Sequence, residues 1–131
     1  MDIIDFYRHE QKRLHDEMRG SVSDLTPEEW NHTIEGRGNS IAFLVWHCAR
    51  TEDNILRFIL QGRPTIWAEG NWHERLNLPP RVQGTGMAME EARSFRLADP
   101  ALFMQYANEV WREYESYLAG ITDEGAALSE R

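Results

Sequence analysis

The sequence is short of the residues on which several functions depend. It has one cysteine, Cys48, so no internal disulfide can form. Lys12 is the only lysine, and 14 basic residues against 22 acidic ones give a net charge of −8. A surface for nucleic acid or for anionic lipid needs clustered Lys and Arg, whereas the arginines here are scattered. We therefore expect neither of these partners.

Long apolar runs are also missing. None approaches the roughly 20 residues that a membrane-spanning helix needs. The first residues, MDIIDFYRHEQKR, lack the basic stretch and apolar segment of a signal peptide. We therefore expect a cytoplasmic protein with no membrane partner. Its 131 residues, 41% of them hydrophobic, suit a single domain spanning residues 1–131.

Helical periodicity dominates what the sequence does contain. The spacing and the capping residues predict three long amphipathic helices, from Asp2 to Arg19 with Gly20 closing it, from Asn39 to Gly62, and from Asp99 to Gly120. Short helices are expected at 26–30 and 88–97. This pattern predicts an all-α, up-down helical bundle. Three long helices leave a groove that a partner chain would fill, so we expect a homodimer or a partly open bundle.

The second long helix carries the most informative residues. Its apolar side chains cover more than half of its circumference, which predicts neighbours on two sides; they are Ile41, Leu44, Val45, Cys48, Ala49, Ile55, Leu56 and Ile59. Cys48 is interpreted as a small buried thiol. Glu52 falls near the centre of this arc, where a carboxylate needs a proton or a partner. We expect an ion pair with Arg8, Arg50 or an arginine of the following loop, with a catalytic acid as the alternative.

Three histidines are candidate metal ligands. His47 lies at the edge of the apolar arc, about 140° from Glu52 around the helix, so these two cannot bind one metal together. His15 lies at the margin of the first helix's apolar face, and His73 is expected near the mouth of a cleft. For His47 and His15, the competing interpretation is a helix-edge histidine with an ordinary hydrogen-bond partner.

The segment after the second long helix is rich in proline and glycine but also carries large aromatic residues. Because disordered segments avoid such residues, we expect an ordered loop across one end of the bundle, with a helical turn that begins at Trp72. We further expect Glu52, Trp67, Trp72 and Tyr106 to line a pocket for a small molecule.

Three stretches of the sequence resemble a known family. LVWHCARTEDN, residues 44–54, closely resembles the second-helix signature of the DinB-like superfamily, in which an apolar run leads into a histidine, Ala-Arg and an acidic pair. GRPTIWAEGNWHERLNLP and GTGMAMEEARSFRLADPALFMQY resemble one branch of it, with a tryptophan-bearing loop, a Gly-x-Gly turn and an Asp-Pro before the third long helix. The likeness runs from Leu25 to about Ile121.

The resemblance implies a four-helix bundle with a divalent metal, typically zinc or nickel, held by three histidines. His47 matches the first ligand; the other two come from a His-x-x-x-His on a fourth helix, whose spacing puts both rings on one face. This chain ends at Arg131 and contains no His-x-x-x-His. We therefore expect the fourth layer to be missing or supplied by a dimer partner, with His15, His73, Glu52 or a partner subunit as sources of replacement ligands.

Two functions follow from the resemblance. The first is a metal-dependent enzyme acting on a small molecule near His47, of the hydrolase or thiol-dependent transferase type. The alternative is a non-catalytic, metal-free dimeric binding module that has kept the bundle and lost the metal site. A nucleic-acid role, which the family's name suggests, is disfavoured by the charge of −8.

Overall fold

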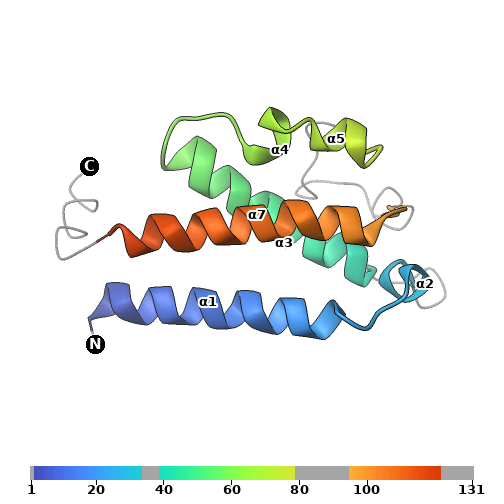
Figure 1. The fold of residues 1–131 in the computed structure, drawn as a ribbon, viewed down its shortest axis with the longest axis horizontal. Coiled ribbons are helices and arrows are strands. Elements are labelled where there is room, and N and C mark those ends of the chain that lie inside the picture. The colour runs from blue at the N-terminus through green and yellow to red at the C-terminus, as the bar shows by residue number, and fades with distance from the viewer. Residues whose placement is uncertain (1, 34–38, 79–94, 122–131) are drawn as a thin grey trace.

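The computed structural model describes residues 2–33, 39–78 and 95–121. Within these ranges the regular structure is entirely helical. The long helices are α1 (Ile3–Val22), α3 (Ile41–Asp53), which continues as the π-helical η1 (Asn54–Ile59), and α7 (Pro100–Ala119); the short ones are α2 (Pro27–Trp30), α4 (Ile66–Glu69) and α5 (Trp72–Arg75). Figure 1 shows α7 running alongside α1, with α3 crossing behind α7 and with α4 and α5 on the side away from α1. None of the helices in these ranges is long and apolar enough to cross a membrane.

Each long helix begins at a capping side chain; Asp2 and Asp99 are the predicted ones, and Ser40 rather than Asn39 caps the central helix. Asp2, Ser40 and Asp99 each accept a hydrogen bond from the amide three residues on, which satisfies one of the free N–H groups of the first turn. Thr26 begins α2, the short helix predicted at 26–30, with a capping box. Gly62 follows the central helix with φ +62°, a left-handed conformation that glycine adopts without strain.

Helix α7 is the centre of the core. It packs against both α1 and α3, and its buried side chains are Pro100, Phe103, Tyr106, Ala107, Val110, Trp111, Tyr114 and Leu118. Burying one large apolar side chain stabilises a fold by about 1.5–3 kcal/mol, so this face supplies much of the driving force. The predicted amphipathic character of the third long helix is therefore confirmed. All five tryptophans are also buried.

Helix α1 is longer than predicted. The sequence pattern closes it at Gly20, but the helix continues to Val22, and Ser23 is its C-cap. Val22 is only 6% exposed and belongs to the core. Glycine inside a helix costs about 1 kcal/mol relative to alanine, and burial of Val22 outweighs that cost.

The buried face of the central helix also differs from the prediction. Ile41, Leu44, Cys48 and Ile59 are exposed, and the buried set consists of Ala42, Phe43, Val45, Trp46, Ala49, Arg50, Asp53, Leu56 and Arg57. Two aromatic side chains and three ionisable ones thus replace part of the predicted aliphatic arc. The π-helical turn contributes to the difference between the predicted and the observed buried face, because its wider hydrogen-bond spacing shifts the positions after Asp53 away from a regular helical period.

The described part of the segment between η1 and α7 agrees in part with the prediction. The helical turn at Trp72 is confirmed as α5, whereas α4 was not predicted. The predicted helix at 88–97 lies mostly outside the described residues. Of its last residues, Phe95 and Leu97 are buried in the core without being helical.

Candidate functional site

Asp53 is a fully buried carboxylate at the junction of α3, α4 and α7. It accepts hydrogen bonds from the backbone N–H groups of Ile66 at 2.8 Å and Trp67 at 2.9 Å, and from the hydroxyl of Tyr106 at 2.7 Å. Burial raises the pKa of Asp53, although these three donors and the nearby Arg50 oppose the rise. Burial and the charge of Asp53 raise the pKa of Tyr106 well above its usual value, so its hydroxyl keeps its proton.

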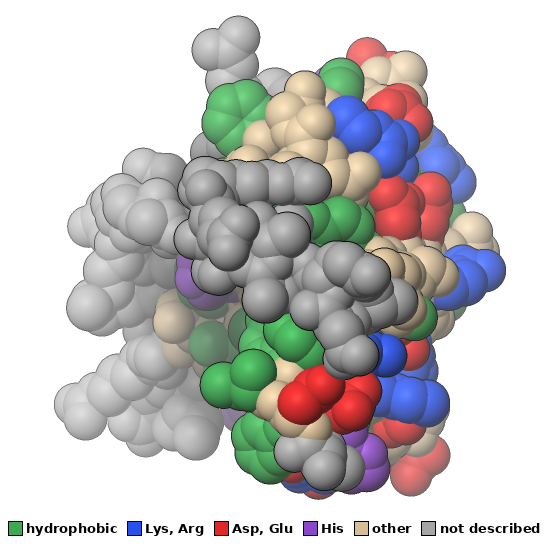
Figure 2. Space-filling view, turned by 90° about the vertical axis from the view of Figure 1, so that its left-hand side faces the viewer, with side chains coloured by type: hydrophobic (Ala, Val, Ile, Leu, Met, Phe, Trp, Pro, Cys, Tyr) green, Lys and Arg blue, Asp and Glu red, His purple; other side chains and the backbone are tan. Residues whose placement is uncertain are grey.

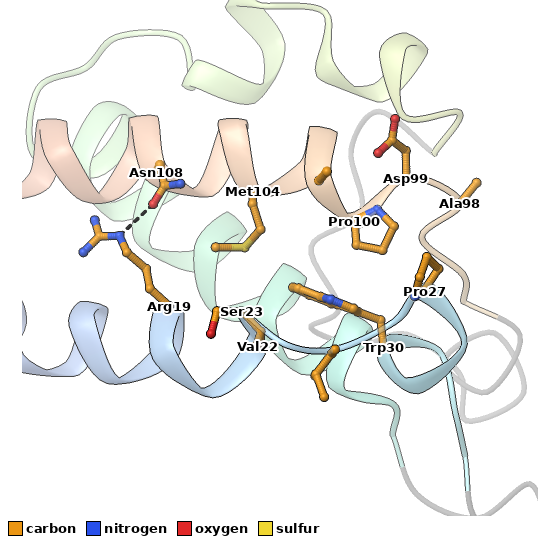
Figure 3. A pocket seen from close by; sticks show the side chains of 12 residues that line it. Arg19, Val22, Ser23, Pro27, Trp30, Ala98, Asp99, Pro100, Met104 and Asn108 are labelled. Carbon is orange, nitrogen blue, oxygen red and sulfur yellow. Dashed lines mark hydrogen bonds between the residues drawn. The ribbon is translucent and has the colours of Figure 1, made fainter.

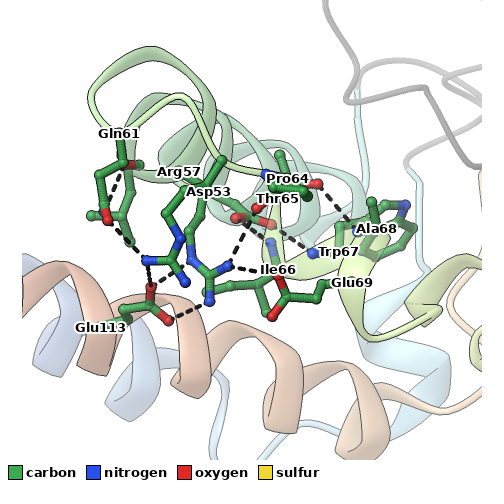
Figure 4. Close-up of polar contacts among 12 residues, drawn as sticks. Asp53, Arg57, Gln61, Pro64, Thr65, Ile66, Trp67, Ala68, Glu69 and Glu113 are labelled. Carbon is green, nitrogen blue, oxygen red and sulfur yellow. Dashed lines mark hydrogen bonds and ion pairs between the residues drawn. The ribbon is translucent and has the colours of Figure 1, made fainter.

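Arg57 forms a second polar cluster on the next turn. Its Nε and Nη2 donate to the two carboxylate oxygens of Glu113 on α7, the latter at 2.9 Å. Its Nη1 donates to Glu69 at 3.2 Å and to the carbonyl of Pro64 at 3.3 Å. Figure 4 shows Arg57 and Asp53 beside each other, between α7 and the loop that leads into α4. The ion pair with Glu113 raises the pKa of Arg57, which keeps its charge. Together the two clusters fix α4 to the bundle.

His15 joins the three long helices. It is fully buried on α1, with Nδ1 2.7 Å from Glu115 on α7 and Nε2 3.0 Å from Glu52 on α3. Its ring stacks on Trp111 with the centroids 5.2 Å apart. With a carboxylate at each ring nitrogen, both nitrogens donate in the imidazolium form. Burial lowers the pKa of His15, but the hydrogen bonds and charges of Glu52 and Glu115 outweigh it and the pKa is raised.

This contact corrects the prediction for Glu52. Its partner is His15 rather than an arginine, and its side chain is 22% exposed at the edge of the buried face instead of at its centre. His15 is correspondingly at the core and not at a margin. A pairing between residues 37 positions apart leaves no local signal in the sequence.

The other two candidate ligands lie elsewhere. His47 is half-buried on α3, with its ring stacked on Phe43 at a centroid distance of 6.0 Å. His73 on α5 has Nε2 3.9 Å from Glu74. In the part of the chain that the structure describes, no three or more His, Cys, Asp or Glu side chains are placed to hold one metal ion. The described side chains therefore do not fit the zinc or nickel site that the resemblance implies, and the role of His47 as a ligand stays a prediction.

The predicted pocket-lining aromatics form a packed cluster. Tyr106 contacts Trp67 at a centroid distance of 5.1 Å and Trp72 at 5.5 Å, and all three side chains are buried. The guanidinium carbon of Arg50 lies 4.6 Å from the centre of the Trp67 ring, a cation–π contact. Glu52 instead contacts His15. That these four residues line a ligand pocket remains a prediction.

Several buried polar atoms on α3 and α5 have no hydrogen bond. Within the described ranges these include Nε and Nη1 of Arg50, Nε1 of Trp46 and Nδ1 of His73. Arg50 is only 5% exposed. Unsatisfied buried groups are rare in native proteins, so each of these atoms is a candidate contact for a further bound group.

Two of the hollows on the described surface border α1. One is a groove of about 320 Å³ between α1 and α3, lined by Leu14, Glu17, Met18, Ser21, Val22, Ile41, Leu44 and Val45. The other is a pocket of about 430 Å³ between α1, α2 and the start of α7.

The polar residues that organise the site were missed from the sequence. Asp53 and Arg57 are four residues apart, and with Trp46 seven residues before Asp53 they share one face of the helix. That spacing was the available signal, but charged residues on an apolar face are usually assigned to solvent. Glu115 has no such signal, because its contact with His15 spans 100 positions.

The geometry defines an all-α protein, a helical bundle built on three long helices with a polar and aromatic junction around the central one. Residues 10–129 match the family profile described as the DinB superfamily. The chain belongs to this superfamily, so the predicted family and fold class are confirmed.

A solved structure described as the conserved protein of locus from Enterococcus faecalis is similar to this chain, with 25% sequence identity and a TM-score of 0.79. The alignment covers 95% of this chain and 74% of that one. A comparison with curated proteins gives no match.

Proposed function

We propose that this chain is a homodimeric, non-catalytic binding member of the DinB superfamily, and that two copies join through the face formed by α1 and α3. The groove of about 320 Å³ between these helices carries the proposal. Its lining includes Leu14, Ile41 and Leu44, which are 44%, 39% and 49% exposed. Contiguous exposed apolar surface of this kind is typical of a protein interface.

The extent of this face favours a second copy as the occupant. Ile3 and Tyr7, at helical spacing from Leu14, continue the apolar stripe toward the start of α1 and are also exposed. A helix of 20 residues is about 30 Å long, and two adjacent helices are about 20 Å wide, so the face covers on the order of 600 Å². A stable interface buries about 800 Å² on each partner. One such face approaches this area on each copy when two copies pair about a two-fold axis.

Charged side chains mark the edge of this proposed interface. On α1, Arg13 pairs with Glu10 and with Glu17, and Glu17 lines the groove. Figure 2, which looks at one end of the molecule, shows charged side chains of both signs along one flank, and hydrophobic side chains beside carboxylates and a histidine in the lower part of the view. Solvated charges beside an apolar strip are the usual arrangement of an interface core and its rim.

Light scattering coupled to gel filtration tests the proposal. We expect the parent chain to elute with the mass of two copies, and the Leu44→Glu variant to elute as a helical monomer. Gln105→Glu, at an exposed position of α7, is the matched control and keeps the dimer. Cys48, exposed one turn after Leu44, supplies a second readout: a thiol reagent reacts with it more slowly in the parent than in Leu44→Glu. A parent chain that stays monomeric at about 100 μM contradicts the proposal.

The second candidate is a metal-dependent enzyme for a small molecule, of the hydrolase or thiol-dependent transferase type, with His47 as one metal ligand. The match of His47 to the first ligand of the family supports it, and the unpartnered N–H groups of Trp46 and Arg50 in the described structure suit an acceptor on a bound small molecule rather than the metal itself. Metal analysis of protein purified without a tag separates the two candidates. Stoichiometric zinc or nickel that is lost in His47→Ala but kept in the exposed control His32→Ala favours the enzyme; its absence from the parent favours the binding protein.

A further inference from the structure

Helix α1 makes few apolar contacts with the rest of the bundle. Of its 20 residues only His15 and Val22 are buried, and its contribution to the main core cluster is Val22 with the partly buried Met18. The other members of this cluster lie on later parts of the chain, chiefly on α3 and α7. The apolar core is therefore largely complete without α1. Elements with little buried apolar surface are the first parts of a fold to open.

Polar side chains attach α1 to its neighbours instead. Apart from the contact of His15 with Glu115, three hydrogen bonds in the described ranges join α1 to α7 and the residue that follows Gly120; they are Tyr7 with Tyr114 at 3.1 Å, Arg8 with the carbonyl of Ile121 at 3.0 Å, and Arg19 with Asn108 at 2.7 Å. Figure 3 shows the last of these. Toward α3, the pair of His15 with Glu52 is the only hydrogen bond or ion pair among the described residues. His15 is thus the one polar link between α1 and α3.

This link depends on the charge of His15. Its Nε2 lies 3.0 Å from Glu52 and its Nδ1 lies 2.7 Å from Glu115, so both nitrogens donate only in the imidazolium form. Neither nitrogen is then free to bind a metal ion. After loss of the proton, a lone pair faces one of the two carboxylates, and their two negative charges have no cation between them. Both carboxylates are partly exposed, so water can replace the ring if α1 moves away.

We infer that α1 docks on α3 and α7 while His15 is charged, and that it detaches when His15 loses its proton and separates the dimer face. The part that concerns the dimer rests on the proposed function. Leu14, the neighbour of His15 in the sequence, lines the groove between α1 and α3. A detached α1 removes this wall of the groove, so dimerisation and protonation of His15 favour the same state of the chain.

The sign of the pH dependence follows from the site. Burial lowers the pKa of His15, but the hydrogen bonds and charges of Glu52 and Glu115 outweigh burial and raise it. A detached α1 exposes the ring to water, where the pKa of histidine is about 6.5. Docking is therefore fully supported by the charge below about pH 6.5, and this support is lost as the pH rises through the pKa of the docked state.

The charged and titratable neighbours on α1 and α3 do not compete with the imidazole. Lys12 on α1 interacts with Glu115, and its hydrogen bond to Asp16 raises its pKa. Cys48 on α3 interacts with Glu52, and burial followed by this carboxylate raises the pKa of its thiol. Lys12 and Cys48 therefore both keep their protons between pH 6 and pH 8.5.

The remaining neighbours also keep their charge state over this range. The ring of Tyr114 on α7 contacts His15 edge-on, and burial raises the pKa of its hydroxyl. The guanidinium carbon of Arg19 lies 5.1 Å from the centre of the Trp111 ring, on which His15 stacks. Arginine stays charged at all of these pH values. None of these groups can therefore take the place of His15 as the switch.

Amide hydrogen exchange at pH 6, 7 and 8.5, corrected for intrinsic exchange rates, tests this inference. We expect the protection of the α1 amides to fall by at least about fivefold over this range, because the opening of α1 grows by up to about tenfold per pH unit between the two pKa values of His15. In His15→Gln the protection of α1 is low at pH 6 and does not fall further. His9→Gln, at an exposed histidine of α1, is the matched control and behaves like the parent. The amides of α7 stay more protected than those of α1.

Sedimentation equilibrium at pH 6 and pH 8.5 gives the second readout. We expect the dissociation constant of the parent dimer to rise by at least about threefold, and that of His15→Gln to stay constant. A parent that is monomeric at both pH values contradicts the proposed dimer, and the exchange data then decide whether α1 detaches. The two proposals therefore fail separately.

Three results overturn the inference: equal protection of the α1 and α7 amides at every pH, the same fall in protection in His15→Gln and the parent, or a dimer of equal affinity at both pH values. If His15→Gln does not fold, Glu52→Gln replaces it. This variant keeps the shape of the side chain and removes the negative charge that binds α1 to α3. A pH dependence as steep as that of the parent then overturns the inference.

Discussion

The hydroxyl of Tyr106 donates to the carboxylate of Asp53 at 2.7 Å, and this bond joins α7 to α3 at the point where α3 changes into a π-helix. The same carboxylate receives the first two amides of α4. One buried side chain thereby connects three elements that are far apart in the sequence. Any change that removes an acceptor from this position leaves a donor buried without a partner.

Asp53→Asn is expected to lower the free energy of unfolding by about 1–3 kcal/mol. The asparagine side chain has one carbonyl oxygen and one NH₂ group, so in either orientation at least one amide of α4 faces another donor. Tyr106→Phe removes a single donor and is expected to cost less than Asp53→Asn. Urea denaturation of both variants measures the two costs. Equal stability of Asp53→Asn and the parent would show that the carboxylate is not needed at this position.

The stability of the parent is expected to fall as the pH rises above about 6.5, the usual pKa of histidine. The folded-state pKa of His15 is raised, so the stabilisation from its charge is complete below the unfolded pKa and is lost as the pH passes through the folded pKa. The neutral ring then presents an unprotonated nitrogen to Glu52 or Glu115. The other groups that face this site are Lys12, which interacts with Glu115, and Tyr114, whose ring contacts His15 edge-on.

His15→Gln isolates this effect, because glutamine carries no charge at any pH. Thermal unfolding of parent and variant at pH 6, 7, 8 and 9 gives the comparison. The difference in stability between them should shrink as the pH rises. A constant difference over this range is the result that would rule out a stabilising imidazolium.

The caps of the long helices offer a simpler measurement. Ser40 is buried and accepts from the amide of Phe43 at 3.0 Å, so Ser40→Ala should cost about 1–2 kcal/mol of unfolding free energy. Ser21→Ala is the matched control, since that serine is exposed and its hydroxyl donates only to the backbone carbonyl of Glu17 in the same helix. Guanidinium denaturation should separate the two variants clearly. If both lose the same stability, the cap contributes nothing specific.

The contrast between helix ends and helix faces shows what the sequence made predictable. Ser40 and Asp99 act within three residues of themselves; Asp99 was predicted as a cap and Ser40 was one of two candidates with Asn39, because the chemistry is local. The buried face of α3 was predicted less well. Leu44 looked like a core residue by periodicity, yet Asp53 takes a core position because its partners come from α4 and α7. Partners of that kind are set by tertiary packing, which no window of the sequence contains.

The candidate site follows the same division. His47 was identified from a motif, whereas the contact of His15 with Glu52 and Glu115 depends on three helices meeting. Charged residues enter a core only when each finds its partner there. The rule that polar residues lie on the surface fails for His15, Asp53 and Arg57. A prediction from amphipathicity alone assigns such residues to the solvent-exposed face.

Arg57→Lys tests whether the second polar cluster holds α4 in place. The guanidinium reaches Glu113 through two nitrogens and Glu69 through a third, whereas a lysine ammonium is a single point of charge and cannot span both carboxylates. We expect faster hydrogen exchange at the amide of Trp67 and a loss of about 1–3 kcal/mol in unfolding free energy. Arg63→Lys is the control, because Arg63 is half-exposed and its Nη1 lies 3.9 Å from Glu113. It should change neither quantity measurably. If exchange at Trp67 is the same in Arg57→Lys as in the control, α4 is held by Asp53 alone.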